Sequence, residues 1–302
     1  MIDTYRFVLV GVLAALLSAG FHAGPAQAAG AEVLQALEAV RGGDGLAGKE
    51  AVGRLATGGG AAVAELAQML GEEGQAAAAQ VLHGLAVFVS APGAGATRLD
   101  FNRAVCRELL SDRPAAVKEI LIQQLHFSGG DDVVPTLAGL LVDAALHEPA
   151  RQALAAIGTP RAAAALRSAL PGSPTAQRIG LVQALGLLKD SRSVDLLIAQ
   201  TRNDSEELRA AAAEALGQIG AYRSEAAIRS LLYASSPRSR RAASHAYLNL
   251  ADSLASARTG VYPGVLDPRG AAAEMYRQIA LASHDEGIRR AAENGLRRLA
   301  QR

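Results

Sequence analysis

The feature that most constrains this chain is a helical sequence pattern that returns after 31 residues. QALGLLKDSRSVDLLIAQ runs from Gln183 to Gln200, and EALGQIGAYRSEAAIRSLL runs from Glu214 to Leu232. When the two are aligned, Ala-Leu-Gly at 215–217 falls on Ala-Leu-Gly at 184–186. A unit of this length is too short to bury its own apolar stripe and must pack against its neighbours. The pattern therefore predicts a repeat architecture.

Seven predicted helices share one template, in which a basic or polar residue is followed seven positions later by Leu. They begin at Gln75, Lys118, His147, Arg178, Arg209, Arg241 and Arg289. The matching residues are Leu82, Leu125, Leu154, Leu185, Leu216, Leu248 and Leu296. A second set of amphipathic segments lies between them, bounded by turns rich in Gly, Pro, Asp and Ser. Each repeat is therefore expected to be a pair of helices.

The composition agrees with stacked helices. Half of the 302 residues are hydrophobic, aromatic residues make up 4 %, and Trp is absent. A core of Ala, Leu, Val and Ile favours closely packed helices over sheets rich in aromatic and β-branched residues. The net charge of +1 and the lack of aromatic residues among the basic ones argue against a nucleic-acid partner.

The repeats resemble a known family. LRAAAAEALGQIGAYRSEAAIRSLL and QRIGLVQALGLLKDSRSVDLLIAQ are similar to the short HEAT repeats of the phycobilisome-lyase type, and the likeness extends over roughly 61–302. In that family an Asp-containing turn precedes a hydrophobic-Arg pair and then Ala-x-x-Ala-Leu-Gly. Here Leu208-Arg209 and Ile288-Arg289 match the pair, and Arg178-Ile179 has it in reversed order. Asp204 and Asp285 are the turn acids. The resemblance implies an all-α, right-handed α-solenoid of about seven helix pairs, with one helix of each pair on a concave face.

The N-terminus is expected to be a signal peptide. The apolar run FVLVGVLAALLSAGF is followed by Ala26-Gln27-Ala28, which fits the small-x-small rule for cleavage after Ala28. Fifteen apolar residues are short for a membrane span, although an uncleaved anchor stays open as the alternative. We expect a periplasmic or secreted protein with no membrane span in the mature chain.

The remaining chain is expected to hold two parts. Residues 29–60 are interrupted by Gly and are interpreted as an atypical N-terminal cap of two short helices. Residues 61–302 form the solenoid, with insertions near 88–102 and 252–270. Loops added to one repeat often carry binding in such proteins, and simple tolerated insertions are the alternative.

One pair of residues invites a metal-site hypothesis. His147 and Glu148 open a repeat helix, and the HEAT-like deoxyhypusine hydroxylases hold two irons with His-Glu pairs on four such helices. Here the equivalent slots hold Lys118, Arg178 and Arg209, which repel a metal ion. We therefore expect His147 to occupy a surface or inter-repeat position, and we expect no metal, no cofactor and no catalytic residue.

The arginine series has two interpretations. Arg178, Arg209, Arg241 and Arg289 recur at one phase of the repeat. In the structural interpretation each guanidinium bridges the Asp or the carbonyls of a neighbouring turn. In the functional interpretation they form a basic stripe for anionic ligands. The basic C-terminal cluster, which includes Arg297 and Arg298, is interpreted as a solvated face and end cap, with partner docking as the alternative.

Two function classes remain from the sequence. The first is an exported, non-catalytic and monomeric scaffold that binds a protein or peptide on its concave face. The second is a HEAT-like enzyme of the lyase or hydroxylase type. Because regular repeats offer similar grooves, selectivity should arise where the pattern breaks, at the late repeats and their loop. The predicted partner-binding residues are Arg178, Arg209, Arg241, Tyr247, Asn249 and Tyr262.

Overall fold

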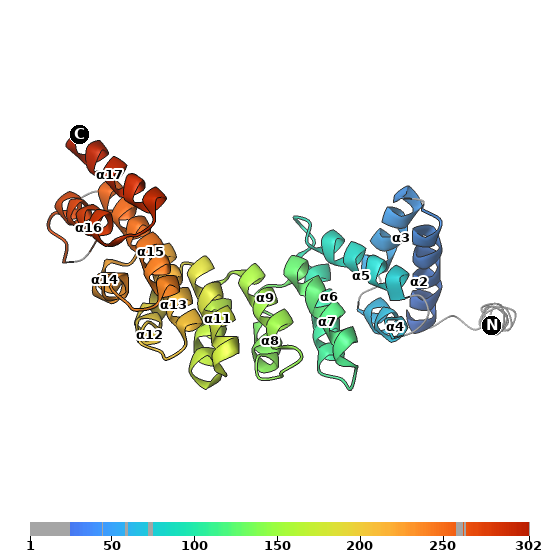
Figure 1. The fold of residues 1–302 in the computed structure, drawn as a ribbon. Coiled ribbons are helices and arrows are strands. Elements are labelled where there is room, and N and C mark those ends of the chain that lie inside the picture. The colour runs from blue at the N-terminus through green and yellow to red at the C-terminus, as the bar shows by residue number, and fades with distance from the viewer. Residues whose placement is uncertain are drawn as a thin grey trace, which may run out of the picture. The chain divides into compact units, whose positions relative to one another are not determined.

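The computed structural model describes residues 25–43, 45–57, 60–71, 75–257, 262 and 264–301 (Figure 1). Within these ranges the chain forms sixteen α-helices, three short 3-10 helices and no strand. The helices divide into two compact units, with the boundary between Val133 and Val134. The predicted all-α solenoid architecture is confirmed.

Unit 1 holds three helix pairs. Its helices are α2 (Pro25–Arg41), α3 (Gly45–Thr57), α4 (Ala61–Met69), α5 (Gln75–Val89), α6 (Gly95–Leu109) and α7 (Ala115–Ser128). The first helices of the pairs, α2, α4 and α6, pack against one another, and so do the second helices, α3, α5 and α7. This two-layered arrangement is that of an α-solenoid. Helices α2 and α3 occupy the segment expected to act as a cap.

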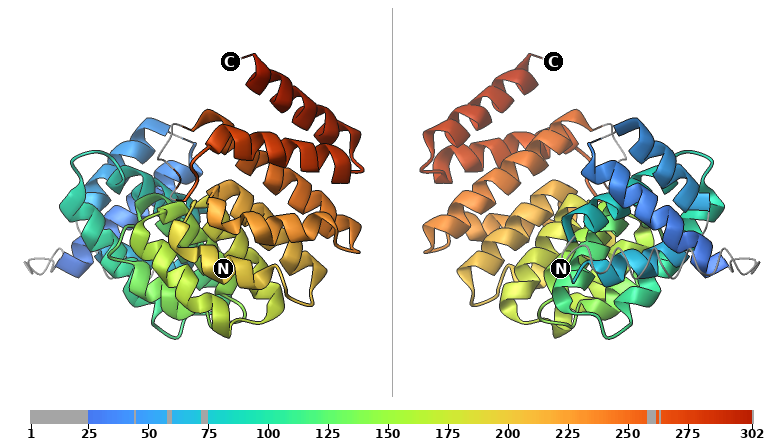
Figure 2. Two further views of the ribbon diagram at one scale, coloured as in Figure 1. Left: turned by 90° about the vertical axis from the view of Figure 1, so that its left-hand side faces the viewer. Right: turned by 90° about the vertical axis from the view of Figure 1, so that its right-hand side faces the viewer.

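Unit 2 holds five pairs. Its helices are α8 (Val134–Leu140), α9 (His147–Ile157), α10 (Pro160–Ala169), α11 (Thr175–Leu187), α12 (Val194–Gln200), α13 (Glu206–Ile219), α14 (Glu225–Leu232), α15 (Pro237–Ser256), α16 (Pro268–Ala282) and α17 (Glu286–Ala300). The second helices, α9, α11, α13, α15 and α17, follow one another in contact along one layer of this unit (Figure 2).

The 31-residue period appears directly in the helix starts of unit 2. Helices α11, α13 and α15 begin at Thr175, Glu206 and Pro237. Ser205 and Ser236 precede the last two, and each hydroxyl accepts a backbone N–H of the first turn. Such N-caps satisfy amide groups that have no partner inside the helix, so they fix where each helix begins.

The turns after α9, α11 and α13 repeat with the same period. Gly158, Lys189 and Gly220 all adopt positive φ, at 66°, 49° and 70°. This left-handed conformation ends a helix by redirecting the chain, and Gly adopts it without steric cost. Lys189 is the only non-Gly residue with positive φ in the described part of the chain.

Small residues bring the second helices of unit 2 close together. A Cβ added to Gly186 would lie 2.7 Å from Cα of Ala215, and one added to Gly217 would lie 2.5 Å from Cα of Ala246. Real Cβ atoms do not approach this closely, so Gly at these positions is required by the packing of α11, α13 and α15. The Ala-Leu-Gly motif is thus an interhelical contact motif.

Two expectations need correction, and a third is not tested. The expected insertion at 88–102 is mostly helix, because α6 begins at Gly95 and leaves only a short turn after α5. The late repeat differs from the predicted register by one residue. Arg240 and Tyr247 take the places of Arg209 and Leu216, instead of Arg241 and Leu248. The expected signal peptide lies almost wholly outside the described residues, and α2 begins at Pro25.

Candidate functional site

Two members of the predicted arginine row, Arg178 and Arg209, hold the turns before their helices. Nε of Arg178 donates to the carbonyl oxygen of Ser173 at 2.9 Å. Nη1 of Arg209 donates to the carbonyls of Asn203 and Asp204, at 2.8 and 2.9 Å. These half-buried guanidinium groups therefore bridge carbonyl oxygens of the preceding turn, which supports the structural interpretation of the row.

The third member of this row is Arg240, which the sequence reasoning missed. Its Nη1 donates to the carbonyls of Ala234 and Ser235, at 2.7 and 2.6 Å. The signal that could have found it is the fixed 31-residue step from Arg209. Arg241, the residue predicted instead, is exposed, and no hydrogen bond or ion pair links it to another described residue. Its guanidinium is therefore available to a ligand.

The predicted role of Tyr247 in partner binding required a surface position, but Tyr247 is buried. Its side chain has no exposed area, because it fills the core position that Leu occupies in earlier repeats. Its hydroxyl donates to the carboxylate of Glu225 on α14 and lies 2.9 Å from the side-chain amide of Gln278 on α16. Burial, reinforced by Glu225, raises the pKa of the Tyr247 phenol. Tyr247 thus links three helices.

The exposed positions of the second helices repeat with the same period. Gln183 on α11, Glu214 on α13 and His245 on α15 form one row of equivalent exposed residues. Four positions further along, Leu187, Gln218 and Asn249 form a second row. We call these six residues the second-helix face. Asn249 was predicted as a contact residue, and its exposure is compatible with that role.

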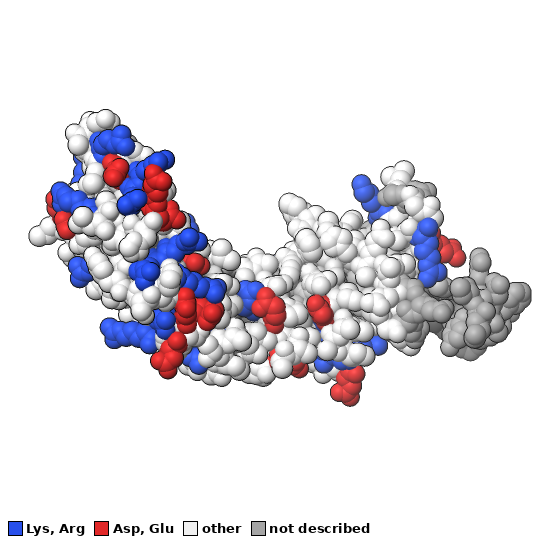
Figure 3. Space-filling model, in the orientation of Figure 1, with Lys and Arg blue, Asp and Glu red and all other residues white. Residues whose placement is uncertain are grey.

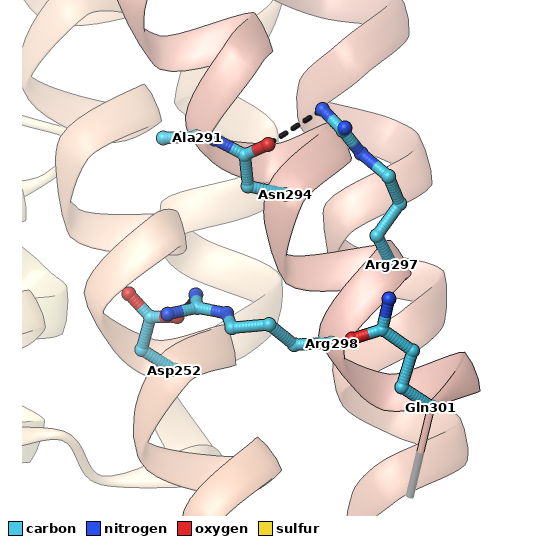
Figure 4. Close-up of a pocket in the computed structure, with 6 residues that line it drawn as sticks. All are labelled: Asp252, Ala291, Asn294, Arg297, Arg298 and Gln301. Atoms are coloured by element: carbon cyan, nitrogen blue, oxygen red, sulfur yellow. Dashed lines mark hydrogen bonds and ion pairs between the residues drawn. The ribbon is translucent and has the colours of Figure 1, made fainter.

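A hollow of about 500 Å³ lies between α15 and α17 (Figure 4). Asp252 on α15 lines one side. The other lining residues, all from α17 and its C-terminal end, are Ala291, Asn294, Arg297, Arg298 and Gln301. Asp252 follows Asn249 by three residues on the same helix, which places it almost one turn further along the same side. The hollow therefore adjoins the second-helix face.

A buried tyrosine fixes the carboxylate of Asp252. Oδ1 of Asp252 accepts a hydrogen bond from the hydroxyl of Tyr276 on α16 at 2.5 Å. Tyr276 is buried under α17, where a Cβ on Gly295 would lie 2.5 Å from Cζ of its ring. Burial, and then the hydrogen bond to Asp252, raise the pKa of the Tyr276 phenol. The hydroxyl therefore stays protonated and remains a donor to Asp252 at neutral pH.

The two arginines of the hollow differ in their partners. Nη2 of Arg298 lies 3.2 Å from Oδ1 of Asp252, so these charges offset each other. Nη2 of Arg297 donates to Oδ1 of Asn294 at 2.6 Å, and no carboxylate in the described part of the chain pairs with it. Figure 4 shows Arg298 reaching across to Asp252 while Arg297 lies beside Asn294. The hollow therefore carries one uncompensated positive charge.

Tyr262 stands apart from these residues in the sequence. It lies in the loop between α15 and α16, is half-buried, and its carbonyl oxygen accepts the N–H of Val265 at 3.1 Å. Most of the loop from 258 to 263 lies outside the described residues. Its predicted role in binding remains a prediction.

His147 has a structural environment. It is 4 % exposed, and its Nδ1 lies 2.7 Å from the carbonyl oxygen of Leu141. The neighbouring carboxylate of Glu148 bonds to Arg151, which lowers the pKa of Glu148. The described residues contain no cluster of three or more His, Cys, Asp or Glu side chains placed to hold a metal ion. Among these residues, no helix is long and apolar enough to cross a membrane.

Unit 1 presents a different kind of surface. Val87 and Phe88 on α5 and Phe127 on α7 expose 50 %, 44 % and 52 % of their area. The rings of His83 and Phe127 meet edge to face, with centroids 4.9 Å apart. Figure 3 shows few charged side chains over α5–α7 on the visible face, whereas both signs are interspersed over unit 2. Unit 1 therefore exposes apolar side chains on α5 and α7, on a face that carries few charges.

Residues 171–250 match a family model described as HEAT repeats. This part of the chain is therefore similar to HEAT repeats. The match covers the regular portion of unit 2, where α11, α13 and α15 follow the 31-residue period. The narrower likeness to lyase-type repeats is not established by this match. No curated protein matches the chain.

The solved structures to which this chain is similar share little sequence with it. An engineered protein matches with 18 % identity and a TM-score of 0.45, covering 83 % of this chain and 71 % of that one. The complex of CpcE and CpcF of phycocyanin lyase from Nostoc sp. PCC7120 matches with 16 % identity and a TM-score of 0.40, covering 78 % and 93 %. Human deoxyhypusine hydroxylase matches with 16 % identity and a TM-score of 0.32, covering 92 % and 98 %.

Proposed function

We propose that this chain is an exported, non-catalytic HEAT-repeat scaffold that binds a protein or peptide partner on the second-helix face of unit 2. The observation that carries the proposal is a difference between two sets of polar side chains on the second helices. Arg178, Arg209 and Arg240 donate hydrogen bonds to the carbonyls of turns. Gln218 and Asn249 lie on the same layer of helices and are exposed, without such bonds. Repeated exposed polar side chains on one layer suit recognition of an extended partner.

The export and the lack of catalysis rest on separate observations. Export is supported by the apolar N-terminal run and the Ala26-Gln27-Ala28 sequence. A non-catalytic role is supported by the arginines that occupy the slots in which the HEAT-like hydroxylases carry metal-binding residues. The buried and hydrogen-bonded state of His147 agrees with this view.

Site-specific photocrosslinking tests the binding face. A photoreactive amino acid is placed in the full chain at Gln218 or Asn249, and the chain is produced in its source cell. The control position is Ala226, which is exposed on α14, a first helix. We expect one discrete protein adduct at both second-helix positions and none at Ala226. No adduct at Gln218 and Asn249, or equal labelling at Ala226, would contradict the proposal.

Two further positions locate the binding site more finely. Phe127 reports on the apolar surface of unit 1, and an adduct there alone would move the site to that unit. Tyr262→Ala tests the loop between α15 and α16. Loss of the Asn249 adduct with an unchanged melting temperature would include the loop in the site, and an unchanged adduct would remove it.

A further inference from the structure

We infer that the hollow between α15 and α17 is a carboxylate-recognition site, which seats an acidic side chain of the peptide segment that this scaffold binds. The inference rests on the proposed function and names the chemistry of the partner. Its volume of about 500 Å³ lies within the range of ligand clefts, and it opens beside the exposed Asn249. It is thus placed to receive a side chain from a peptide lying along the second-helix face.

The charge of the hollow selects a singly charged anion. Two guanidinium groups and one carboxylate line it, and Arg298 is paired with Asp252. The remaining cation is Arg297, whose only hydrogen-bond partner among the described residues is the neutral amide of Asn294. A guanidinium group has five N–H donors arranged to bind a carboxylate through two parallel hydrogen bonds. A bound carboxylate would leave the hollow close to neutral.

The same lining disfavours other anions. A doubly charged phosphate would face the carboxylate of Asp252, which is fixed in the wall by Tyr276. Nucleic acid is disfavoured because no aromatic residue lines the hollow for base stacking. The amides of Asn294 and Gln301 offer both donors and acceptors, as the backbone of a peptide requires.

A second exposed cation on α15, about 16 Å along the helix from Asp252, favours an acidic peptide over an isolated ion. Arg241 on α15 is exposed and unpaired among the described residues, and it lies on the same helix as Asp252. Arg290 on α17 is paired with Glu286, so it adds little positive charge to this surface. The exposed surface of this helix pair therefore offers a second cation, at Arg241, to a peptide that carries more than one carboxylate.

Fluorescence anisotropy with the full chain tests the inference. The probe is a short labelled peptide of alternating glutamate and alanine, amidated at its C-terminus, and the reference peptide has glutamine in place of glutamate. At physiological ionic strength we expect the glutamate peptide to bind about ten-fold more tightly, because a hydrogen bond to a charged group contributes this much. Equal binding of the two peptides would overturn the inference.

Two variants and a matched control locate the effect. Arg297→Gln should remove most of the preference for glutamate. Asp252→Asn should strengthen binding, because it removes the opposing charge while its oxygen still accepts from Tyr276. Arg289→Gln is the control, since Arg289 is exposed on the same helix but does not line the hollow, and it should change binding less than about three-fold. Equal losses for Arg297→Gln and Arg289→Gln would show general attraction by positive charge and overturn the site.

Other probes and the crosslinking result complete the test. A phosphoserine version of the peptide, or a short thymidine oligonucleotide, that bound about ten-fold more tightly than the glutamate peptide would reassign the ligand class and overturn the inference. Adducts at Gln218 and Asn249 without any preference for glutamate would refute the carboxylate site and leave the proposed function intact. Far-ultraviolet circular dichroism of each variant checks that the helices remain folded.

Discussion

A Cβ atom on Gly217 would lie 2.5 Å from Cα of Ala246, so α13 and α15 pack backbone against backbone at this point. Gly is normally unfavourable inside a helix by about 0.5–1 kcal/mol relative to Ala. Gly nevertheless stands at Gly186 and again 31 residues later at Gly217. At both positions the next second helix occupies the space that a side chain would need.

Gly217→Ala should therefore lower the free energy of unfolding by about 1–3 kcal/mol, since the two helices must separate to admit the methyl group. The matched control is Gly139→Ala in α8, where an added Cβ meets no atom within 4 Å. It should be neutral or stabilising by up to about 1 kcal/mol. Urea unfolding of both variants measures the difference, and a stabilised Gly217→Ala protein would show that the close packing is wrong.

Arg240→Ala should destabilise unit 2, whereas Arg241→Ala should not. The first variant removes two hydrogen bonds to the carbonyls of Ala234 and Ser235, a loss of about 1–3 kcal/mol. The second removes an exposed side chain without a partner and should change stability by less than about 0.5 kcal/mol. Thermal unfolding followed by circular dichroism compares the two, and the reverse order would restore the register first expected from the sequence.

Tyr247 and Tyr276 should resist ionisation near pH 10, where exposed tyrosines titrate. Folding raises the pKa of both phenols, so the folded chain holds these protons more tightly than the unfolded chain does. Their contribution to stability is complete below about pH 10 and is lost as the pH rises further.

The phenolate absorbance of the six tyrosines measures this effect. We expect part of the absorbance change to be delayed until the protein unfolds in alkali, and Tyr247→Phe to reduce that delayed part. Titration of all six tyrosines in one transition near pH 10 would exclude the buried hydrogen bonds to Glu225 and Asp252.

Lys189→Gly should stabilise the chain by about 1 kcal/mol, because a residue with a side chain is strained in the left-handed region. Gly220→Ala, at the equivalent turn one repeat later, should destabilise it by a similar amount. Differential scanning calorimetry of the pair gives both changes. Opposite signs from those expected would mean that the turn after α11 differs from the turn after α13.

Processing of the N-terminus should leave Ala29 as the first residue, if the chain is exported as proposed. Such a cut would remove Pro25–Ala28 from the start of α2. N-terminal sequencing of the secreted or periplasmic protein identifies the cut, and Ala28→Asp should block it. Full-length protein retained in the membrane fraction would favour the anchor over the cleaved signal.

The sequence determined the repeat, the two-helix unit and the helical class of this protein, because the period of apolar residues and the composition of turns are local properties. It also located the second helices of all seven predicted repeats, and the resemblance to HEAT repeats agrees with the match over 171–250. The late register failed because Tyr247 replaces Leu in the core and so hides the motif from a search for Leu.

Tertiary structure alone decided which side chains remain available to a ligand. Arg178 and Arg241 look alike in the sequence, yet one holds the carbonyl of Ser173 and the other is free in the described structure. The hollow beside Asp252 forms because α15 contacts α17, although α16 separates them in the sequence. Local sequence patterns fix where helices form, whereas the partners of a polar side chain depend on which helices meet, and that is set by packing.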